Sequence, residues 1–340
     1  MNLRKVYPLL LVFFFYSCSN LLVNGPSTNL NVEDFDSAWK ITKSVYPYFK
    51  FKNINWDSLY TIYRPQAVVA KGDEIYNVLI KMYGVLKDGH VDVISENGID
   101  MQTYIPPRKL RDEKTFDPLV VRRYFNKELL VTPDFYIEYG TLDNNIGYIR
   151  VPTLLPDLKG SFSTALDYLR NTNALIIDVR NDDGGTDYNS DYIVSRLINN
   201  PSPNLSVQLI TGEIEQEPPI QPSGAYQYTK PVVLLINGAC FSACEDFVAL
   251  MKGVSTVTEI GDTTAGASGA PVIYTLPSGK KIRISTKDIM RLDKQPIEWN
   301  GNIPDILVTQ TADDISRGKD KQLEQAIQFL TLKNKNMTRR

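Results

Sequence analysis

Two short and almost wholly apolar runs constrain the fold of this chain more than any other feature. Residues 174–179 and 231–236 are each the length of a strand, and each is followed by a turn and then by a helical pattern, over 189–197 and 242–252. A strand that is apolar on both faces must be covered on both faces, as the strands of a parallel sheet are. Strands that alternate with helices therefore predict an α/β layered core.

This core is expected to occupy residues 145–333. Its other predicted strands and helices lie over 146–151, 157–170, 257–260, 272–274, 281–285 and 322–330. Apolar residues at three- and four-residue spacing predict helices over 32–49, 57–63 and 73–86, which together indicate an N-terminal helical domain over residues 32–95. Residues 96–144 are predicted to form a small β-rich segment, with strands over 119–122 and 128–132.

The first 18 residues have the pattern of a lipoprotein-type signal peptide. A basic start over residues 1–5 precedes an apolar stretch over 7–16, which is too short to span a bilayer as a stable helix. The context of Cys18 is similar to a bacterial lipobox, so we expect Cys18 to carry a lipid. The alternative is a plain signal peptide with an incidental cysteine. Residues 19–31 are expected to form a solvated tether.

The composition narrows the chemistry that the chain can perform. Lys and Arg number 37 against 39 Asp and Glu, for a formal net charge of −2, so the clustered basic surface of a nucleic-acid binder is not expected. The sequence contains one histidine, His90, and three cysteines, Cys18, Cys240 and Cys244. These numbers predict no His-rich zinc site, no disulfide framework and no cofactor. Any acid–base chemistry by imidazole must use His90.

Three turns can present reactive groups. Ser242 lies at a strand-to-helix turn, where the unpaired N–H groups of the first helical turn suit a developing oxyanion. The alternative is that Ser242 only caps the helix, with Glu245 completing a capping box. The pair Gly184 and Gly185 permits close backbone approach to a ligand, or serves only a tight turn. His90, in a turn between helix and strand, is either a structural residue or one that projects into a cleft.

Taken in order, these segments resemble those of one peptidase family, the S41 family of C-terminal processing (tail-specific) proteases together with the tricorn-type proteases. The segments that carry the resemblance are residues 86–91, 146–150, 175–185, 231–245, 261–266 and 297–305. The resemblance implies a ClpP/crotonase-like layered core. It also implies an exported hydrolase of peptides or unfolded proteins, held at a membrane through the lipid on Cys18.

The resemblance also implies which residues act. The processing proteases use a Ser–Lys dyad, but the position of that lysine falls here on Ala267 or Ser268, so a dyad is not expected. The tricorn-type branch uses Ser, His and Glu, and these motif positions match Ser242, His90 and Glu298. The segment between the His90 strand and the core has about 50 residues, the lower limit for a domain, so the PDZ domain of the processing proteases is not expected either.

Under this interpretation the chain is a serine peptidase that acts through an acyl-enzyme. Ser242 attacks the peptide carbonyl, His90 transfers the proton, and Glu298 orients the imidazole. An unperturbed imidazole pKa of about 6.5 suits both proton transfers. The oxyanion is expected to be held by backbone N–H groups of Ala243 and of either Gly184 or Gly185.

Two alternatives accompany this interpretation. Cys240 or Cys244 is a rival nucleophile, although Cys244 lies about half a helical turn from Ser242 and so is expected to face elsewhere. In the second alternative the chain is a catalytically inactive S41-like lipoprotein that binds peptides or small ligands. In either case the protein is expected in the cell envelope of a bacterium, with its domain in the periplasm or at the surface. The sequence specifies no oligomeric state.

Overall fold

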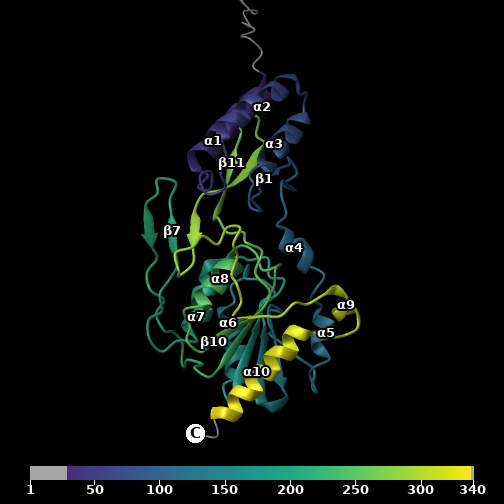
Figure 1. The fold of residues 1–340 in the computed structure, drawn as a ribbon, viewed down its shortest axis with the longest axis vertical. Helices are drawn as coiled ribbons and strands as arrows, with labels where there is room; N and C mark the ends of the chain where they lie inside the picture. Colours follow the sequence, from purple (N-terminus) through teal and green to yellow (C-terminus); the bar gives the residue numbers. More distant parts are fainter. Residues whose placement is uncertain (1–28, 338–340) are drawn as a thin grey trace, which may run out of the picture.

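The computed structural model describes residues 29–337, so the predicted signal peptide and Cys18 lie outside the described residues. The described chain forms two bodies stacked along its long axis (Figure 1). The upper body consists of helices on a small sheet and is called the helical unit below, and the lower body is an α/β core. Within residues 29–337 no helix is both long and apolar enough to cross a membrane.

The core is built on a seven-stranded sheet in the order β14-β10-β9-β6-β5-β4-β3. Its strands are β3 (Leu130–Val131), β4 (Glu138–Leu142), β5 (Ile146–Arg150), β6 (Ala174–Asp178), β9 (Val232–Ile236), β10 (Val257–Gly261) and β14 (Ile306–Leu307). Neighbouring strands from β5 to β14 pair in parallel, whereas β3 and β4 are antiparallel. Every residue of β6 and β9 is buried, which confirms the two apolar runs as central strands.

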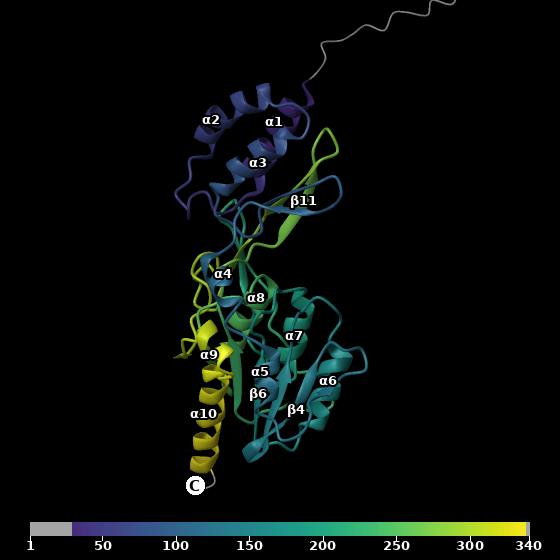
Figure 2. The ribbon, with the colours of Figure 1, turned by 90° about the vertical axis from the view of Figure 1, so that its right-hand side faces the viewer.

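Helices cover both faces of this sheet (Figure 2). They are α6 (Lys159–Tyr168), α7 (Asp187–Ser195), α8 (Ala243–Met251) and α10 (Lys321–Met337). Successive residues of a strand point to opposite faces. Leu175 and Ile177 of β6 accordingly pack in the cluster of α6, α7 and α8, while Ala174 and Ile176 pack in the cluster of α10. The predicted α/β layered fold is confirmed.

The helical unit draws on both halves of the sequence. Its helices are α1 (Leu30–Val45), α2 (Trp56–Val69) and α3 (Glu74–Gly84), and its sheet has the order β11-β12-β1-β2. The strands are β1 (Asp92–Ile94), β2 (Asp100–Gln102), β11 (Pro271–Thr275) and β12 (Lys281–Ser285). The β11–β12 hairpin extends out of the core and pairs with β1, with Ile282 opposite Val93 (Figure 2). The hairpin therefore ties the helical unit to the core.

The segment between the two bodies contains more helix than expected. It includes α4 (Pro107–Asp112) and α5 (Pro118–Arg122), and α4 lies between the helical unit and the core in both views (Figures 1 and 2). The predicted strand over 119–122 is wrong, because this run lies in α5. Asp117 caps that helix by accepting from the Leu119 N–H at 2.8 Å, and Pro118 fits the first helical turn.

The remaining elements lie at the edges of the core. They are the 3₁₀ helix η1 (Asp143–Asn145), the helix α9 (Ala312–Ser316) and a three-stranded sheet of β7 (Ser206–Gln208), β8 (Ile214–Gln216) and β13 (Asp288–Met290).

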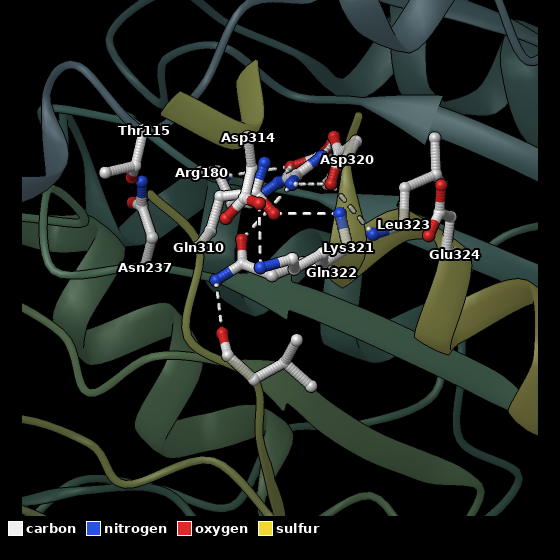
Figure 3. Close-up of polar contacts among 12 residues, drawn as sticks. Thr115, Arg180, Asn237, Gln310, Asp314, Asp320, Lys321, Gln322, Leu323 and Glu324 are labelled. Atoms are coloured by element: carbon white, nitrogen blue, oxygen red, sulfur yellow. Dashed lines mark hydrogen bonds and ion pairs between the residues drawn. The ribbon is translucent and has the colours of Figure 1, made fainter. Parts of the chain in front are cut away.

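A buried ionic network fixes the loop that follows β6. The guanidinium of Arg180 donates to Asp178 Oδ2 at 2.6 Å, to Asp320 Oδ1 at 2.8 Å and to Gln322 Oε1 at 3.2 Å. Figure 3 shows Arg180 beside Asp320 and Gln322 at the start of α10. Removing one partner of a buried ion pair typically costs about 3–5 kcal/mol. Arg180 therefore anchors the loop that carries the glycine pair.

Candidate active site

Ser242 occupies a strained turn between β9 and α8. Its backbone φ of 58° and ψ of −132° lie in a region that residues with a side chain rarely adopt. Such a conformation costs about 1–3 kcal/mol and persists only where the surroundings fix it. Here the Ser242 N–H donates to the carbonyl of Ala267 at 3.0 Å. A serine on a strained strand-to-helix turn is the arrangement that exposes a nucleophile in α/β hydrolases.

The capping alternative for Ser242 is wrong. Within the described residues the Ser242 side chain makes no capping hydrogen bond to α8. The Glu245 carboxylate instead accepts from the turn over 264–267, including the Ala267 N–H at 3.2 Å, and from the Asn302 amide at 3.0 Å. Burial raises the pKa of Glu245 to about 7. Glu245 thus holds the turn over 264–267, and the Ala267 carbonyl of this turn accepts the Ser242 N–H.

Gly184 lies directly against the Ser242 turn. A Cβ on Gly184 would lie 2.7 Å from Ser242 Cβ and from the Phe241 carbonyl oxygen, and 2.8 Å from the Ala243 nitrogen. The φ of Gly184 is 95°, so both the space and the backbone conformation require glycine. The structure thus brings the predicted oxyanion residues Ala243 and Gly184 together beside Ser242.

Asp182 stabilises the glycine turn through a hydrogen bond. Its Oδ1 accepts the Gly184 N–H at 2.7 Å, so this N–H group is already engaged. Its Oδ2 is buried and has no hydrogen-bond partner among residues 29–337. Burial raises the pKa of Asp182 to about 8, so the side chain is largely neutral at neutral pH.

His90 packs against the residue that precedes Ser242. Its ring stacks on Phe241 with a centroid distance of 4.5 Å and an interplanar angle of 24°. The side chain is buried, and neither ring nitrogen has a hydrogen-bond partner in the described part of the chain. Burial lowers the pKa of His90 to about 4, although the nearby Asp88 opposes this shift. The imidazole is therefore neutral at neutral pH and able to accept a proton.

Glu298 is buried and forms an ion pair with Lys52. Its Oε1 accepts from Lys52 Nζ at 2.6 Å, and its Oε2 accepts the Ser268 N–H at 3.4 Å. Burial and the charge of Asp88 raise the pKa of Glu298, while Lys52 opposes the rise. The carboxylate whose charge acts on His90 is that of Asp88. The structure therefore packs Gly184 against Ser242 and His90 against Phe241, and the imidazole makes no hydrogen bond to Ser242 or to Glu298 in the described chain.

Lys52 is a residue of this site that no sequence motif predicts. Its buried Nζ donates to the Leu86 carbonyl at 3.0 Å and the Lys87 carbonyl at 3.3 Å, and lies 3.7 Å from Asp88 Oδ2. Three aromatic rings surround it, those of Tyr46, Tyr48 and Trp299, at 5.7, 5.2 and 5.2 Å. The one sequence signal is the aromatic-rich run over residues 46–51. Lys52 joins the His90 turn to Glu298.

The cysteine alternative is not compatible with the structure. Cys240 and Cys244 are both fully buried, and their sulfurs lie 3.2 and 3.8 Å from the carbonyl of Val179 at the end of β6. Burial raises the pKa of the Cys244 thiol, which disfavours the reactive thiolate. Both thiols therefore belong to the core.

Comparisons with known proteins support this fold. Residues 145–308 match the model of peptidase family S41, and residues 31–84 match that of the tricorn protease C1 domain. The chain is similar to the carboxy-terminal processing protease CtpA of Bacillus subtilis, with 25% identity over 166 residues. That match covers 48% of this chain and 35% of CtpA, so the chain spans about a third of this curated relative.

Solved structures extend the similarity over nearly the whole chain. A candidate peptidase from Parabacteroides merdae superposes with a TM-score of 0.78 and 28% identity, covering 88% of this chain and 96% of that one. Mature CPAF complexed with lactacystin shares the fold, with a TM-score of 0.64 and 14% identity over 91% of this chain and 98% of that one. Fold and site define an α/β protein with a strained serine turn. Over residues 145–308 the chain belongs to peptidase family S41.

Proposed function

We propose that this protein is a serine peptidase that hydrolyses peptide bonds through an acyl-enzyme on Ser242. The observation that carries the proposal is the convergence of three elements: the strained Ser242 turn, the Gly184 turn packed on it and the His90 ring stacked on Phe241. Membership of a peptidase family supports the same reaction. The alternative of an inactive ligand-binding lipoprotein has no comparable support.

The proposed reaction uses the neutral imidazole of His90 as its base. Ser242 Oγ attacks the peptide carbonyl carbon as its proton passes to His90, and the resulting imidazolium then protonates the leaving amine. Water attacks the acyl-enzyme by the reverse sequence and frees Ser242. Because both ring nitrogens of His90 lack partners in residues 29–337, one is available to Ser242 and one to a carboxylate. Apo contacts of this kind commonly tighten when substrate binds.

The oxyanion donors in this proposal are the backbone N–H groups of Ala243 and Gly185. Ala243 begins α8, where the helix dipole also favours negative charge. The N–H of Gly184 is engaged by Asp182, so the role of Gly184 is close packing rather than donation. Losing one oxyanion donor typically costs about 10²–10³ in rate.

Glu298 and Lys52 act in this proposal by positioning. Lys52 binds Glu298 and the carbonyls that precede the His90 turn, so it fixes the distance between the carboxylates and the imidazole. Asp88 then supplies the negative charge that stabilises the imidazolium, while Glu298 holds Lys52 in place. Lys52 touches no reacting atom and is a positioning residue.

Fluorophosphonate labelling tests the proposed activity directly. We expect the wild-type chain to be labelled covalently and Ser242→Ala to be unlabelled, because the probe forms its bond with an activated serine hydroxyl. Ser316→Ala, which removes an exposed hydroxyl on α9, is the matched control and should label like the wild type. Equal labelling of the wild type and Ser242→Ala would overturn the proposal.

Export and the lipid anchor remain proposals of the same kind, supported by the sequence pattern around Cys18. In a bacterial host the wild-type chain should sediment with the membrane fraction and incorporate labelled fatty acid. Cys18→Ser should do neither. A chain that is soluble in both forms would contradict the anchor without affecting the proposed chemistry.

A further inference from the structure

A recess of about 380 Å³ lies beside the proposed site, and its lining includes two cations and no carboxylate among the described residues. Its volume falls within the ~300–1,000 Å³ typical of small-molecule sites. The residues that give it chemical character are Lys87, Tyr104, Arg108 and Trp299. Proline, alanine and glycine residues complete the walls. The recess therefore combines positive charge with aromatic surface.

Each wall of the recess is continuous with the proposed reactive residues. Lys87 lies three positions before His90, and Trp299 directly follows Glu298. Gly266 belongs to the turn that Glu245 holds, and Ala267 of the same turn accepts the Ser242 N–H. The recess and the Ser242 turn therefore share the turn over 264–267 as a common neighbour.

The two cations of the recess differ from the other cations nearby. On α4, Lys109 pairs with Asp183, and Arg111 pairs with Asp262. In the described chain, by contrast, neither Lys87 nor Arg108 forms an ion pair. Because neither cation has an acidic partner, both are available to bind an acidic group of a ligand.

Arg108 is held in place by backbone alone. Its Nη2 donates to the Trp299 carbonyl at 2.5 Å and to the Ala265 carbonyl at 3.4 Å, which leaves its other N–H groups for a ligand. Gly266 makes this placement possible, because a Cβ there would lie 2.5 Å from Nη2. The guanidinium is thus oriented before any ligand arrives, and its planar donors suit a carboxylate.

We propose that this recess binds a carboxylate of the peptide substrate, with Arg108 and Lys87 as its cationic partners and Trp299 and Tyr104 packing on the adjoining substrate chain. This inference rests on the proposed function and gives its substrate a chemical class, that of anionic peptides. The carboxylate comes either from an Asp or Glu side chain or from the carboxyl end of the peptide.

Peptide capture tests the recess without requiring catalysis. The full-length Ser242→Ala chain is immobilised and incubated with two acetylated random hexapeptide libraries, one ending in a free carboxylate and one in an amide. Captured peptides are sequenced by mass spectrometry. At least a fivefold enrichment of Asp or Glu from the amide library identifies a side-chain source. At least a fivefold excess of free-acid over amide peptides identifies the terminal source. Absence of both overturns the proposal.

Substitutions of the two cations test whether the captured carboxylate binds in this recess. In the Ser242→Ala background we expect Arg108→Gln and Lys87→Gln each to reduce the enrichment at least threefold, whereas Arg317→Gln keeps it. Arg317 is an exposed arginine on the turn after α9, so its loss changes the net charge equally. If circular dichroism shows that Arg108→Gln is unfolded, Lys87→Gln decides the test. Undiminished enrichment in the folded variants would contradict this recess as the binding site.

The capture and labelling experiments fail independently. Wild-type labelling without anionic capture retains the proposed peptidase and removes the recess. Anionic capture without labelling retains the recess as a peptide-binding site and removes the proposed peptidase.

Discussion

The core and the helical unit contribute to the proposed site by different physical means. The core contributes backbone: a strained turn at Ser242 and a glycine turn at Gly184 that no side chain can enter. The helical unit contributes two buried polar side chains, His90 and Lys52, and Lys52 pairs with Glu298 of the core. The backbone half of the site, Ser242 and Gly184, depends on local geometry. The charged half, His90, Lys52 and Glu298, depends on how the two bodies pack together.

This difference implies that the two halves respond differently to change. A backbone turn of this kind tolerates no added atom, because the atoms packed around Gly184 leave no space for a Cβ. A buried charge cluster is strongly destabilised when one charge loses its partner. The β11–β12 hairpin and Lys52 both cross from one body to the other, so the charged half also depends on the interface.

The largest expected effect is that of His90→Ala. Fluorophosphonate labelling should fall by about 10²–10⁴-fold, the usual contribution of a general base. The chain should stay folded but with a lower melting temperature, because removing the buried ring leaves a cavity beside Phe241. Labelling rates and differential scanning calorimetry measure the two effects. Near-wild-type labelling of His90→Ala would show that the helical unit supplies no base.

Gly184→Ala tests the backbone half. The new Cβ would collide with the Ser242 turn at 2.7 Å, so we expect labelling to fall by about 10²–10³-fold, as when an oxyanion donor is displaced. Gly160→Ala is the matched control, since a Cβ there meets nothing within 4 Å. Unchanged labelling of Gly184→Ala would mean that the glycine turn serves only the fold.

Lys52→Met tests the charged half. Removing the ammonium leaves Glu298 and Asp88 without their counter-charge, which should destabilise the chain by about 3–5 kcal/mol and reduce labelling. Lys43→Met, which breaks an exposed pair with Asp57, should cost no more than about 1 kcal/mol. Urea denaturation measures both.

A double variant separates positioning from stability in this cluster. Lys52→Met combined with Glu298→Gln removes both charges of the pair, so it should regain stability relative to Lys52→Met. If the Lys52–Glu298 pair positions the site, labelling stays low in the refolded double variant. Recovery of labelling together with stability would reduce Lys52 to a purely structural residue.

The pH dependence of labelling distinguishes this buried His90 from an exposed histidine. Burial lowers the pKa of His90 to about 4, so the basic form persists as the pH falls. Labelling should therefore stay level from pH 7 to pH 5 and decline only as the pH approaches 4. An acidic limb near the ordinary histidine pKa of about 6.5 would contradict this burial. The Ser316→Ala control should show the wild-type profile.

The smallest expected effect is that of Asp182→Asn on stability. Because the folded pKa is raised to about 8, the neutral side chain stabilises the fold at low pH, and this contribution is lost as the pH rises through 8. The amide stays neutral, so the melting temperature of the variant relative to wild type should rise by a few degrees between pH 5 and pH 9, at roughly 2–4 °C per kcal/mol. Asp183→Asn, an exposed neighbour, should show no such trend.

Much of the core is predictable from the sequence. The runs that became β6 and β9 are almost wholly apolar, which is typical of a strand covered on both faces. Ser242 and Gly184 were predictable as a pair of turns because each directly follows such a strand. The error at residues 119–122 arose where β-branched residues follow Asp117 and Pro118, whose capping geometry outweighs their strand preference.

The charged half of the site is much less predictable. Lys52 has no periodicity or motif, and its partners Leu86, Lys87 and Glu298 lie 34, 35 and 246 positions away. The capping box at Ser242 and Glu245 fits the sequence pattern, yet the structure directs Glu245 to the turn over 264–267. Long-range contacts of this kind decide between alternatives that local spacing leaves equal.

By itself the sequence determined the layered core, the positions of the serine and glycine turns and the single imidazole available for chemistry. Those features follow from local rules, since strand burial, turn composition and residue counts are properties of neighbouring residues. Only the tertiary structure decided the partner of Glu298, the neutral state of His90 and the unpaired cations beside the site. The physical reason is that desolvation and charge pairing depend on which surfaces pack together. The packing of the helical unit on the core involves residues far apart in the sequence, so no single segment predicts it.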